Sequence, residues 1–307
     1  MSFEDRDGYI WMDGEFVDWR DAKVHVLTHT LHYGLGVFEG VRAYQTDRGP
    51  AIFRLERHTE RFLQSAKIMG MRVPFSAAQI SQAQIDAVKK NQLNSAYIRP
   101  MAWYGAQAMG LHAKGLKTHM MVGAWEWGSY LGDEAIENGI RVKTSSFTRH
   151  HVNSTMAKAK TNGHYVNSIL ATQEAEACGY DEGLLLDASG YVAEGSGENI
   201  FIVRRGKLYT PMLTSALEGI TRDTIFELAK DDLGLEIVEK QITRDEVYTA
   251  DEAFFTGTAA EVTPIRSLDE REIGAGGAGE ITKELQTRYF DLVHGRDQSR
   301  QDYLTYI

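Results

Sequence analysis

The sequence predicts an α+β fold with two domains. The chain has 307 residues, of which 43% are hydrophobic and 25% are charged, so it can bury more than one core of ordinary size. Segments with helical and strand periodicity are mixed along the chain, without the strict alternation of a doubly wound parallel sheet. We predict a small N-terminal domain at residues 1–128, a polar linker at 129–135 and a larger C-terminal domain at 136–307.

The first half opens with a β-hairpin. Residues 9–12 and 15–17 are predicted to form two strands on either side of Asp13-Gly14, a pair that favours the tight turn of a two-residue hairpin. Apolar residues at helical spacing then predict two helices, and β-rich stretches predict two strands. These elements are the helices 55–69 and 76–91 and the strands 96–104 and 119–127.

The second half mixes strands and helices in the same way. One helix is expected to begin near Gly219 and to end at Gly234, because glycine commonly follows the last turn of a helix. Residues 193–199 are rich in glycine and are expected to form a loop. The other predicted elements are the strands 140–145, 183–187, 200–204 and 252–256 and the helix 164–178.

Composition excludes several classes of protein. Lys and Arg total 33 against 43 Asp and Glu, a formal charge of -10, and no basic run offers a surface for a nucleic-acid backbone. The single cysteine, Cys178, excludes an intrachain disulfide and a metal site built on several thiolates. The start of the chain is unlike a secretory signal, and no apolar run approaches the roughly 20 residues of a membrane span. We expect a cytoplasmic protein without metal, nucleic-acid or membrane partners.

Three short segments could contact a ligand, and each also has an ordinary structural interpretation. Gly219-Ile220-Thr221 begins a helix, which suits a phosphate or a simple N-cap. Thr256-Gly257-Thr258-Ala259-Ala260 could expose backbone N–H groups or allow tight packing. In the segment Glu194 to Asn199, one of the two glutamates could hold a heteroaromatic nitrogen protonated, or both could lie in a solvated turn. Spacing alone does not separate these alternatives.

A lysine could unite the three segments. A Schiff base to pyridoxal phosphate requires an amine, a phosphate anchor and a partner for the pyridine nitrogen. Lys160 lies beside Asn162-Gly163 and a helix start, and Lys158 precedes it by two residues. A serine hydrolase is not indicated, since no G-x-S-x-G occurs and Gly195-Ser196-Gly197 has the wrong spacing. The three segments do not identify which lysine would serve.

Several motifs together resemble the bacterial branched-chain amino acid aminotransferases, which are fold-type IV pyridoxal-phosphate enzymes of D-amino acid aminotransferase-like architecture. The likeness runs in the family's order from about Tyr9 to Gly274. It implies a small N-terminal α/β domain and a larger, β-rich C-terminal domain that binds pyridoxal 5'-phosphate. The motifs are His32-Tyr33-Gly34, Val37 to Tyr44, Tyr97-Ile98-Arg99-Pro100, Glu194 to Asn199, Gly219 to Arg222 and Gly257 to Glu261.

The resemblance implies a cofactor site. Lys160, with a tyrosine five places later, matches the family's Schiff-base lysine, although Thr161, Asn162 and His164 differ from the commoner small residues. It leaves Lys158 without a role. Glu194 would pair with the pyridine nitrogen, and Tyr165 would hydrogen-bond the phenolic oxygen of the ring. The implied phosphate ligands are Arg61, Ile220, Thr221 and Thr258.

The resemblance also implies a reaction. The amino group of L-leucine, L-isoleucine or L-valine would pass to 2-oxoglutarate, giving branched-chain 2-oxo acids and L-glutamate; this is the last step of branched-chain amino acid biosynthesis and the first of degradation. Arg99 would meet the glutamate side chain, and Tyr97 with the N–H groups of Thr258 and Ala259 would hold the α-carboxylate. The implied apolar walls are Tyr33, Phe38, Trp127 and Tyr130.

A homodimer is implied as the minimal unit, because Tyr33 and Leu111 would enter the neighbour's active site; such dimers could assemble into a hexamer. Two alternatives stay within the same fold: a D-amino acid aminotransferase and an aminodeoxychorismate lyase. A third, from a different class, is a non-catalytic phosphate-binding or regulatory module. Loss of a visible absorption band in Lys160→Ala would separate the enzymes from the module.

Overall fold

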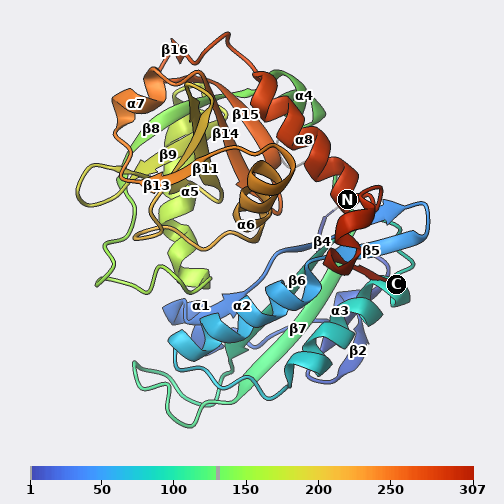
Figure 1. Cartoon of the computed structure of the whole chain (residues 1–307). Helices are drawn as coiled ribbons and strands as arrows, with labels where there is room; N and C mark the ends of the chain where they lie inside the picture. Colours follow the sequence, from blue (N-terminus) through green and yellow to red (C-terminus); the bar gives the residue numbers. More distant parts are fainter. Residues whose placement is uncertain (1, 129–131) are drawn as a thin grey trace. The chain divides into compact units, whose positions relative to one another are not determined.

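A computed structural model describes residues 2–128 and 132–307. The chain divides into two compact units (Figure 1). The first unit contains the described residues up to Trp127, together with Ala159–His164 and Val293–Ile307. The second contains the rest of the described chain, including Lys158 and the stretch Tyr165–Leu292. The predicted domain limits 1–128, 129–135 and 136–307 stay a prediction; helix α4 begins at Asp133, and residues 129–131 lie outside the described part of the chain.

The first unit is built on an antiparallel sheet. Its strands follow the order β17-β5-β4-β6-β7-β1-β2, and β3 pairs with β6 beside this path. The hairpin predicted at Asp13-Gly14 is confirmed, with both residues at positive φ. The strands are β1 (Tyr9–Met12), β2 (Glu15–Asp18), β3 (Gly36–Phe38), β4 (Val41–Thr46), β5 (Gly49–Phe53), β6 (Ala96–Tyr104), β7 (Thr118–Trp125) and β17 (Leu304–Tyr306).

Two amphipathic helices, α2 (Leu55–Ile68) and α3 (Ala77–Lys90), pack against this sheet (Figure 1). Both were predicted to within a residue or two. Ser76 caps α3 in a reciprocal capping box with Gln79, which fixes the start of the helix. Phe62, Ile80, Ile98 and Met120 are fully buried where helices and sheet meet. The shorter helical segments are α1 (His29–Tyr33), η1 (Trp19–Asp21), η2 (Asn162–His164) and η4 (Gln298–Tyr303).

The second unit is built on a mixed sheet in the order β10-β9-β8-β15-β14-β11-β12-β13, with β16 beside β15. The pairs β8–β9, β8–β15 and β12–β13 are parallel, and the other pairs are antiparallel. The strands are β8 (Ile140–Thr148), β9 (Glu182–Leu186), β10 (Val192–Gly195), β11 (Asn199–Arg204), β12 (Lys207–Pro211), β13 (Ile237–Lys240), β14 (Glu252–Gly257), β15 (Glu261–Leu268) and β16 (Arg271–Glu272).

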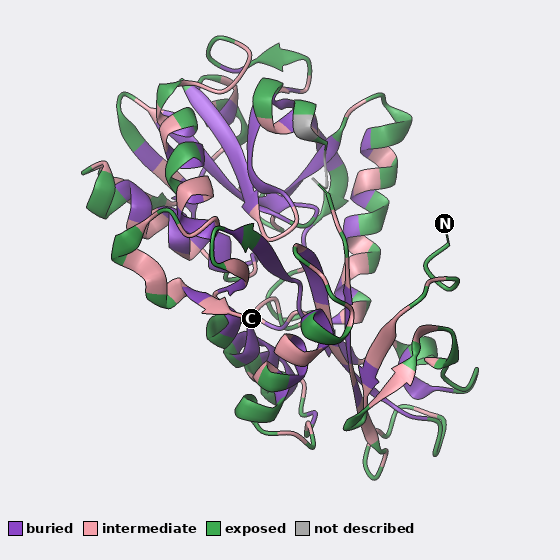
Figure 2. Ribbon diagram, turned by 90° about the vertical axis from the view of Figure 1, so that its right-hand side faces the viewer, coloured by how far each residue is buried: buried purple, intermediate pink, exposed green. Residues whose placement is uncertain are grey.

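Helices cover the second sheet. Helix α5 packs on β8 and β9, and α6 packs on β14. The Phe226 ring of α6 meets the Phe201 ring edge-on, and Phe201 in turn stacks on Phe254. In Figure 2 the strands are drawn largely as buried, whereas the helices alternate buried and exposed residues. The predicted α+β class is confirmed. The helices are α4 (Asp133–Asn138), α5 (Tyr165–Ala177), α6 (Ile220–Glu227) continued by the π-helix η3 (Leu228–Asp232), α7 (Arg244–Tyr248) and α8 (Glu280–Val293).

One prediction about this unit was wrong. Residues 193–199 were expected to form a loop, but Val192–Gly195 form strand β10 and Asn199 begins β11. Strand β10 pairs with β9 through a register shift between Val192 and Glu194, and this irregularity hides the strand's alternation in the sequence. Glu194 therefore projects from a sheet and not from a solvated turn.

Candidate active site

The backbone of Lys160 is held on two sides within the first unit. Its N–H donates to Ser65 Oγ at 3.0 Å, and its carbonyl accepts from the Phe38 N–H at 3.1 Å. Thr161 forms an isolated bridge with Val37 on β3. These contacts fix the segment between strand β3 and helix α2, so the direction in which the lysine side chain leaves the backbone is set by regular structure.

Close approach of two glycines completes this anchorage. The Gly163 N–H donates to the Gly34 carbonyl at 3.1 Å, and Gly34 has a φ of 72°. A Cβ on Gly34 would lie 3.1 Å from the Gly163 Cα. Glycine in the motif His32-Tyr33-Gly34 is therefore required for the Lys160 segment to approach α1 this closely.

Lys160 and Arg99 both lie near the aromatic ring of Phe38. Lys160 Nζ lies 5.1 Å from the Phe38 ring centroid, and the Arg99 guanidinium carbon lies 4.7 Å from it. Arg99 Nη2 donates to the Tyr97 hydroxyl at 3.1 Å. Thus the structure gathers four residues of the predicted site, two of them cationic and two aromatic, within the first unit.

An aromatic wall adjoins Tyr97. Its ring lies 5.1 Å from Trp127 and 5.3 Å from Trp125, centroid to centroid. Trp127 was predicted, and Trp125 was missed. Its signal was the spacing Trp125-Glu126-Trp127, because side chains two apart on an extended segment share a face.

Arg61 makes a bidentate ion pair inside the first unit. Its Nε and Nη2 donate to Glu39 at 2.7 and 2.9 Å, and His58 Nδ1 lies 2.8 Å from the same carboxylate. Glu39 is fully buried. Burial by itself raises the pKa of Glu39, but Arg61 and His58 outweigh burial and hold that pKa well below its usual value. Burial also lowers the pKa of His58, which favours a neutral ring that donates to Glu39.

Glu39 and His58 form a buried cluster with the predicted site residue Arg61 that the sequence analysis missed. The signal for His58 was its position three residues before Arg61, which places both side chains on one face of α2. Glu39 lies in the motif Phe38-Glu39-Gly40 but had been given no role. The ion pair orients the guanidinium of Arg61, which is the predicted phosphate ligand.

Tyr33 and Leu111 lie at the surface of the first unit. Tyr33 is 42% exposed and Leu111 is 87% exposed. The Tyr33 hydroxyl accepts from the Gly110 N–H at 3.0 Å, which ties the loop carrying Leu111 to α1. Tyr130, the remaining predicted wall residue, lies outside the described residues.

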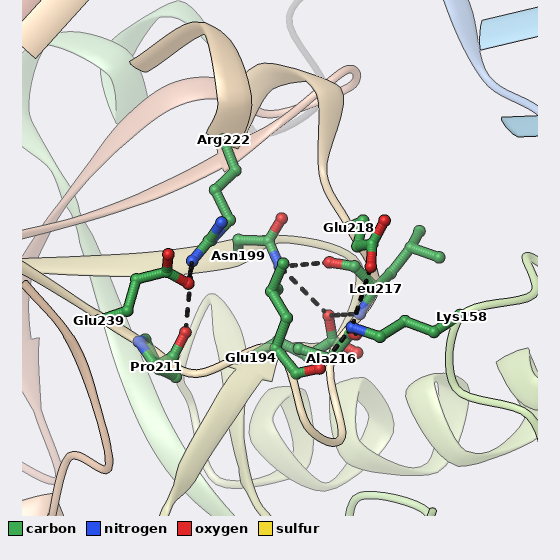
Figure 3. A network of polar contacts seen from close by, with 10 residues as sticks. Lys158, Glu194, Asn199, Pro211, Ala216, Leu217, Glu218, Arg222 and Glu239 are labelled. Carbon is green, nitrogen blue, oxygen red and sulfur yellow. Dashed lines mark hydrogen bonds and ion pairs between the residues drawn. The ribbon is translucent and has the colours of Figure 1, made fainter. Parts of the chain in front are cut away.

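In the second unit, Glu194 is buried on β10 and held by three groups. Arg149 Nε lies 2.6 Å from Oε1. The Leu217 N–H donates to Oε2 at 3.1 Å, and Asn199 Nδ2 lies 3.5 Å from the same oxygen (Figure 3). Arg149 follows directly after strand β8 and was not predicted. These contacts hold the carboxylate in one orientation, as a partner for a ring nitrogen requires.

Helix α6 begins at Gly219 without a side-chain cap. A Cβ at Gly219 would lie 1.9 Å from Asn199 Oδ1, so a larger residue there would displace the Asn199 side chain that contacts Glu194. Ile220 and Thr221, both predicted phosphate ligands, are buried in the first turn. The uncapped backbone N–H groups and the helix dipole suit an anion at this end.

The remaining predicted residues of the second unit lie at the ends of secondary structure. Tyr165 begins α5 and is half-buried. Thr258 and Ala259 follow β14 and are half-buried. Just before them, Thr256 Oγ1 is buried and has no hydrogen-bond partner among the described residues. A polar atom of this kind commonly marks a ligand site or bound water.

The chain belongs to the amino-transferase class IV family, whose model matches residues 36–268. A branched-chain-amino-acid aminotransferase of Pseudomonas aeruginosa is 61% identical over 307 residues, covering 100% of both chains. The crystal structure of the T.th. branched-chain amino acid aminotransferase with pyridoxamine 5'-phosphate superposes with a TM-score of 0.95 at 51% identity, covering 98% of this chain and 99% of the other.

A second structure of the T.th. enzyme, complexed with N-(5'-phosphopyridoxyl)-L-glutamate, has a TM-score of 0.94 at 49% identity and covers 98% of this chain and 99% of the other. These likenesses confirm the predicted fold-type IV architecture. Within residues 2–128 and 132–307, no helix combines the length and the apolar character that crossing a bilayer requires.

Proposed function

We propose that this chain is a pyridoxal-phosphate-dependent transaminase that moves the amino group of L-leucine, L-isoleucine or L-valine to 2-oxoglutarate. The observation that carries the proposal is Lys160, a lysine fixed by its backbone to β3 and α2, whose amine lies near the same Phe38 ring that Arg99 contacts. Membership of the aminotransferase family and 61% identity over 307 residues to a branched-chain enzyme support it.

The residues present fit the cofactor by their chemistry. Lys160 supplies an amine for covalent attachment, and the buried carboxylate of Glu194 suits a protonated ring nitrogen. Tyr165 would hydrogen-bond the phenolic oxygen. The phosphate would be held by Arg61, oriented by Glu39, and by Ile220, Thr221 and Thr258. When bound, pyridoxal phosphate supplies an electron sink that makes the α-proton of an amino acid removable.

The chain's own residues would orient the substrate and move the proton. The Lys160 amine, released from the cofactor by the incoming amino acid, would take the proton from the substrate α-carbon and return it during transfer. Tyr97 and the N–H groups of Thr258 and Ala259 would hold the α-carboxylate. The apolar walls would come from Tyr33, Phe38, Leu111, Trp127 and Tyr130.

Arg99 would let one pocket accept both an aliphatic and a carboxylate side chain. It is half-buried, and its Nε is buried without a hydrogen-bond partner among the described residues. An incoming glutamate carboxylate would pair with this guanidinium, whereas a leucine side chain would lie against the neighbouring rings of Phe38 and Tyr97.

A panel of amino donors tests the proposal. With 2-oxoglutarate as acceptor, L-leucine, L-isoleucine and L-valine should give L-glutamate, and the purified protein should show the visible absorption of a lysine-bound cofactor. Activity with D-amino donors in place of L-donors would favour the D-amino acid aminotransferase. Release of pyruvate from aminodeoxychorismate would favour the lyase, and a colourless protein without cofactor would favour the non-catalytic module.

Arg99→Ala should lower kcat/KM for glutamate and 2-oxoglutarate by about 10- to 100-fold, the effect of losing a hydrogen-bonded charge pair. The half-reaction with leucine should change far less, because its side chain carries no charge. Single-turnover kinetics with each substrate measure both effects in one preparation. Equal losses for leucine and glutamate would remove Arg99 from this role.

We also propose a homodimer formed through an apolar surface of the first unit. Val26, Leu31 and Leu111 are 75%, 64% and 87% exposed. A solvated surface rarely exposes several large aliphatic side chains to this extent. Partner contact would cover them and bring Tyr33 and Leu111 to the neighbour's site. A cytoplasmic location remains a prediction.

Light scattering should give at least twice the chain mass of 34.4 kDa, and it also distinguishes a dimer from a hexamer. Leu111→Glu should shift the mass toward the monomer, because the interface would bury an unpaired charge. Ile68→Glu, a change at a 41% exposed position on α2, is the matched control and should leave the mass unchanged. A monomeric wild-type protein would refute the dimer.

A further inference from the structure

Lys158 is engaged inside the second unit, although the resemblance gave it no role. Its Nζ donates to the carbonyls of Leu213 and, at 3.3 Å, Ala216, and it lies 3.4 Å from Glu218 Oε1. An ammonium has three N–H donors, and here three oxygens surround it. All three acceptors come from residues 213–218, the connection between β12 and α6. We call this segment the 213–218 loop.

The same loop contacts Glu194. The Leu217 N–H donates to Glu194 Oε2 at 3.1 Å, and the Leu217 carbonyl accepts from Asn199 Nδ2 at 3.0 Å. Figure 3 shows Lys158 meeting Ala216 and Glu218 of the loop while Glu194 and Asn199 meet Leu217. The loop then leads directly into Gly219 and the first turn of α6.

We infer that Lys158 is a positioning residue: it fixes the 213–218 loop, and through Leu217 it sets the orientation of the Glu194 carboxylate and the start of α6. This inference rests on the proposed function for the meaning of Glu194, but its structural half concerns only the second unit. Lys158 belongs to that unit, whereas Lys160, two residues on, belongs to the first.

Electrostatics agree with the geometry. Burial lowers the pKa of Lys158, while the negative charges of Glu218 and Glu194 oppose that change by favouring the ammonium. Lys158 therefore places a positive charge near Glu194 as well as holding the loop whose Leu217 N–H donates to that carboxylate. A neutral side chain at this position would remove both effects.

Lys158→Met tests the inference, because methionine keeps an unbranched side chain and removes the ammonium. Lys143→Met is the matched control. Lys143 is also a partly buried lysine of the second unit, but its Nζ lies 3.1 Å from the Thr144 carbonyl and 3.5 Å from Glu174, away from the 213–218 loop. Both variants lose a lysine that has carbonyl and carboxylate partners, so general destabilisation affects both.

Amide hydrogen exchange in cofactor-free protein gives the first measurement. Exchange at Leu217 should become at least about 10-fold faster in Lys158→Met, since local opening of the loop exposes this N–H. Lys143→Met should leave it unchanged. Glu218→Gln, which keeps both carbonyl contacts, should give a smaller increase and serves if Lys158→Met does not fold. Unchanged exchange in Lys158→Met, or equal acceleration in Lys143→Met, would overturn the inference.

Titration with pyridoxal phosphate gives the second measurement. The dissociation constant should rise about 10-fold in Lys158→Met and the pH midpoint of the visible absorption band should shift, since one charge-assisted contact to the Glu194 support is lost. The Lys143→Met titration should match wild type. Faster exchange with unaltered cofactor binding and spectrum would overturn the link to Glu194. Failure of the wild-type protein itself to bind the cofactor would refute the proposed function, while the exchange result would stand independently.

Discussion

Lys160→Ala should abolish transamination, with kcat falling by at least about 10³-fold. Removing the amine eliminates both covalent attachment of the cofactor and the base that moves the α-proton, and a positioned base alone contributes about 10²- to 10⁴-fold. The visible absorption of the lysine-bound cofactor should disappear at the same time. Stopped-flow kinetics and absorption spectra of the purified variant measure the two effects.

Covalent labelling provides the control for Lys160→Ala. Reduction with borohydride followed by peptide mass spectrometry should find the cofactor on Lys160 in the wild type and still on Lys160 in Lys158→Ala. Lys158 is committed to the 213–218 loop and offers its amine to backbone carbonyls and Glu218. Label on Lys158, or comparable loss of attachment in both variants, would contradict the assignment of the reactive lysine.

Glu39→Gln should lower the free energy of unfolding by about 3–5 kcal/mol at neutral pH. Glutamine keeps the shape of the side chain but removes the charge that faces Arg61, and breaking a buried ion pair by removing one partner is strongly destabilising. Glu39 is completely buried, and the Arg61 side chain is only 11% exposed, so water cannot replace the lost partner. Chemical denaturation followed by circular dichroism measures the change.

The stability difference between wild type and Glu39→Gln should change with pH in one direction. The pKa of Glu39 is lowered in the folded chain, so its ionised form stabilises the fold above the ordinary carboxyl pKa of about 4.3 and this contribution is lost as pH falls further. The difference between wild type and Glu39→Gln should therefore narrow in acid. Glu60→Gln is the matched control on the same helix, since its exposed ion pair with Arg57 is worth less than about 1 kcal/mol. A Glu39→Gln effect as small as this control would contradict the prediction.

Elements with strong local signals could be predicted closely. The helix α3 was placed correctly because apolar spacing and the Ser76 capping box lie within the helix itself. Strand β10 was missed because its register shifts beside Glu194 and glycines surround it. The hydrophobic pattern of a short segment indicates a single helix or strand, whereas a bulge depends on the neighbouring strand with which the bulged strand pairs.

The contacts of the candidate site were less accessible to sequence reasoning. Lys158 is indistinguishable from a solvated lysine until its acceptors, 55 and 58 residues further along the chain, are known. Glu39 and Arg61 are 22 residues apart and come from different elements. Periodicity does not indicate such pairings. The family motifs located the residues, and only the fold showed which side chains support them.

The first unit is assembled from three separate stretches of chain, and its edge strand β17 pairs with β5. Protein synthesis delivers these stretches in order, so β5 leaves the ribosome about 250 residues before its partner. The nascent first unit therefore keeps an open sheet edge while most of the second unit emerges, and chaperones that shield unpaired strands would act during that interval.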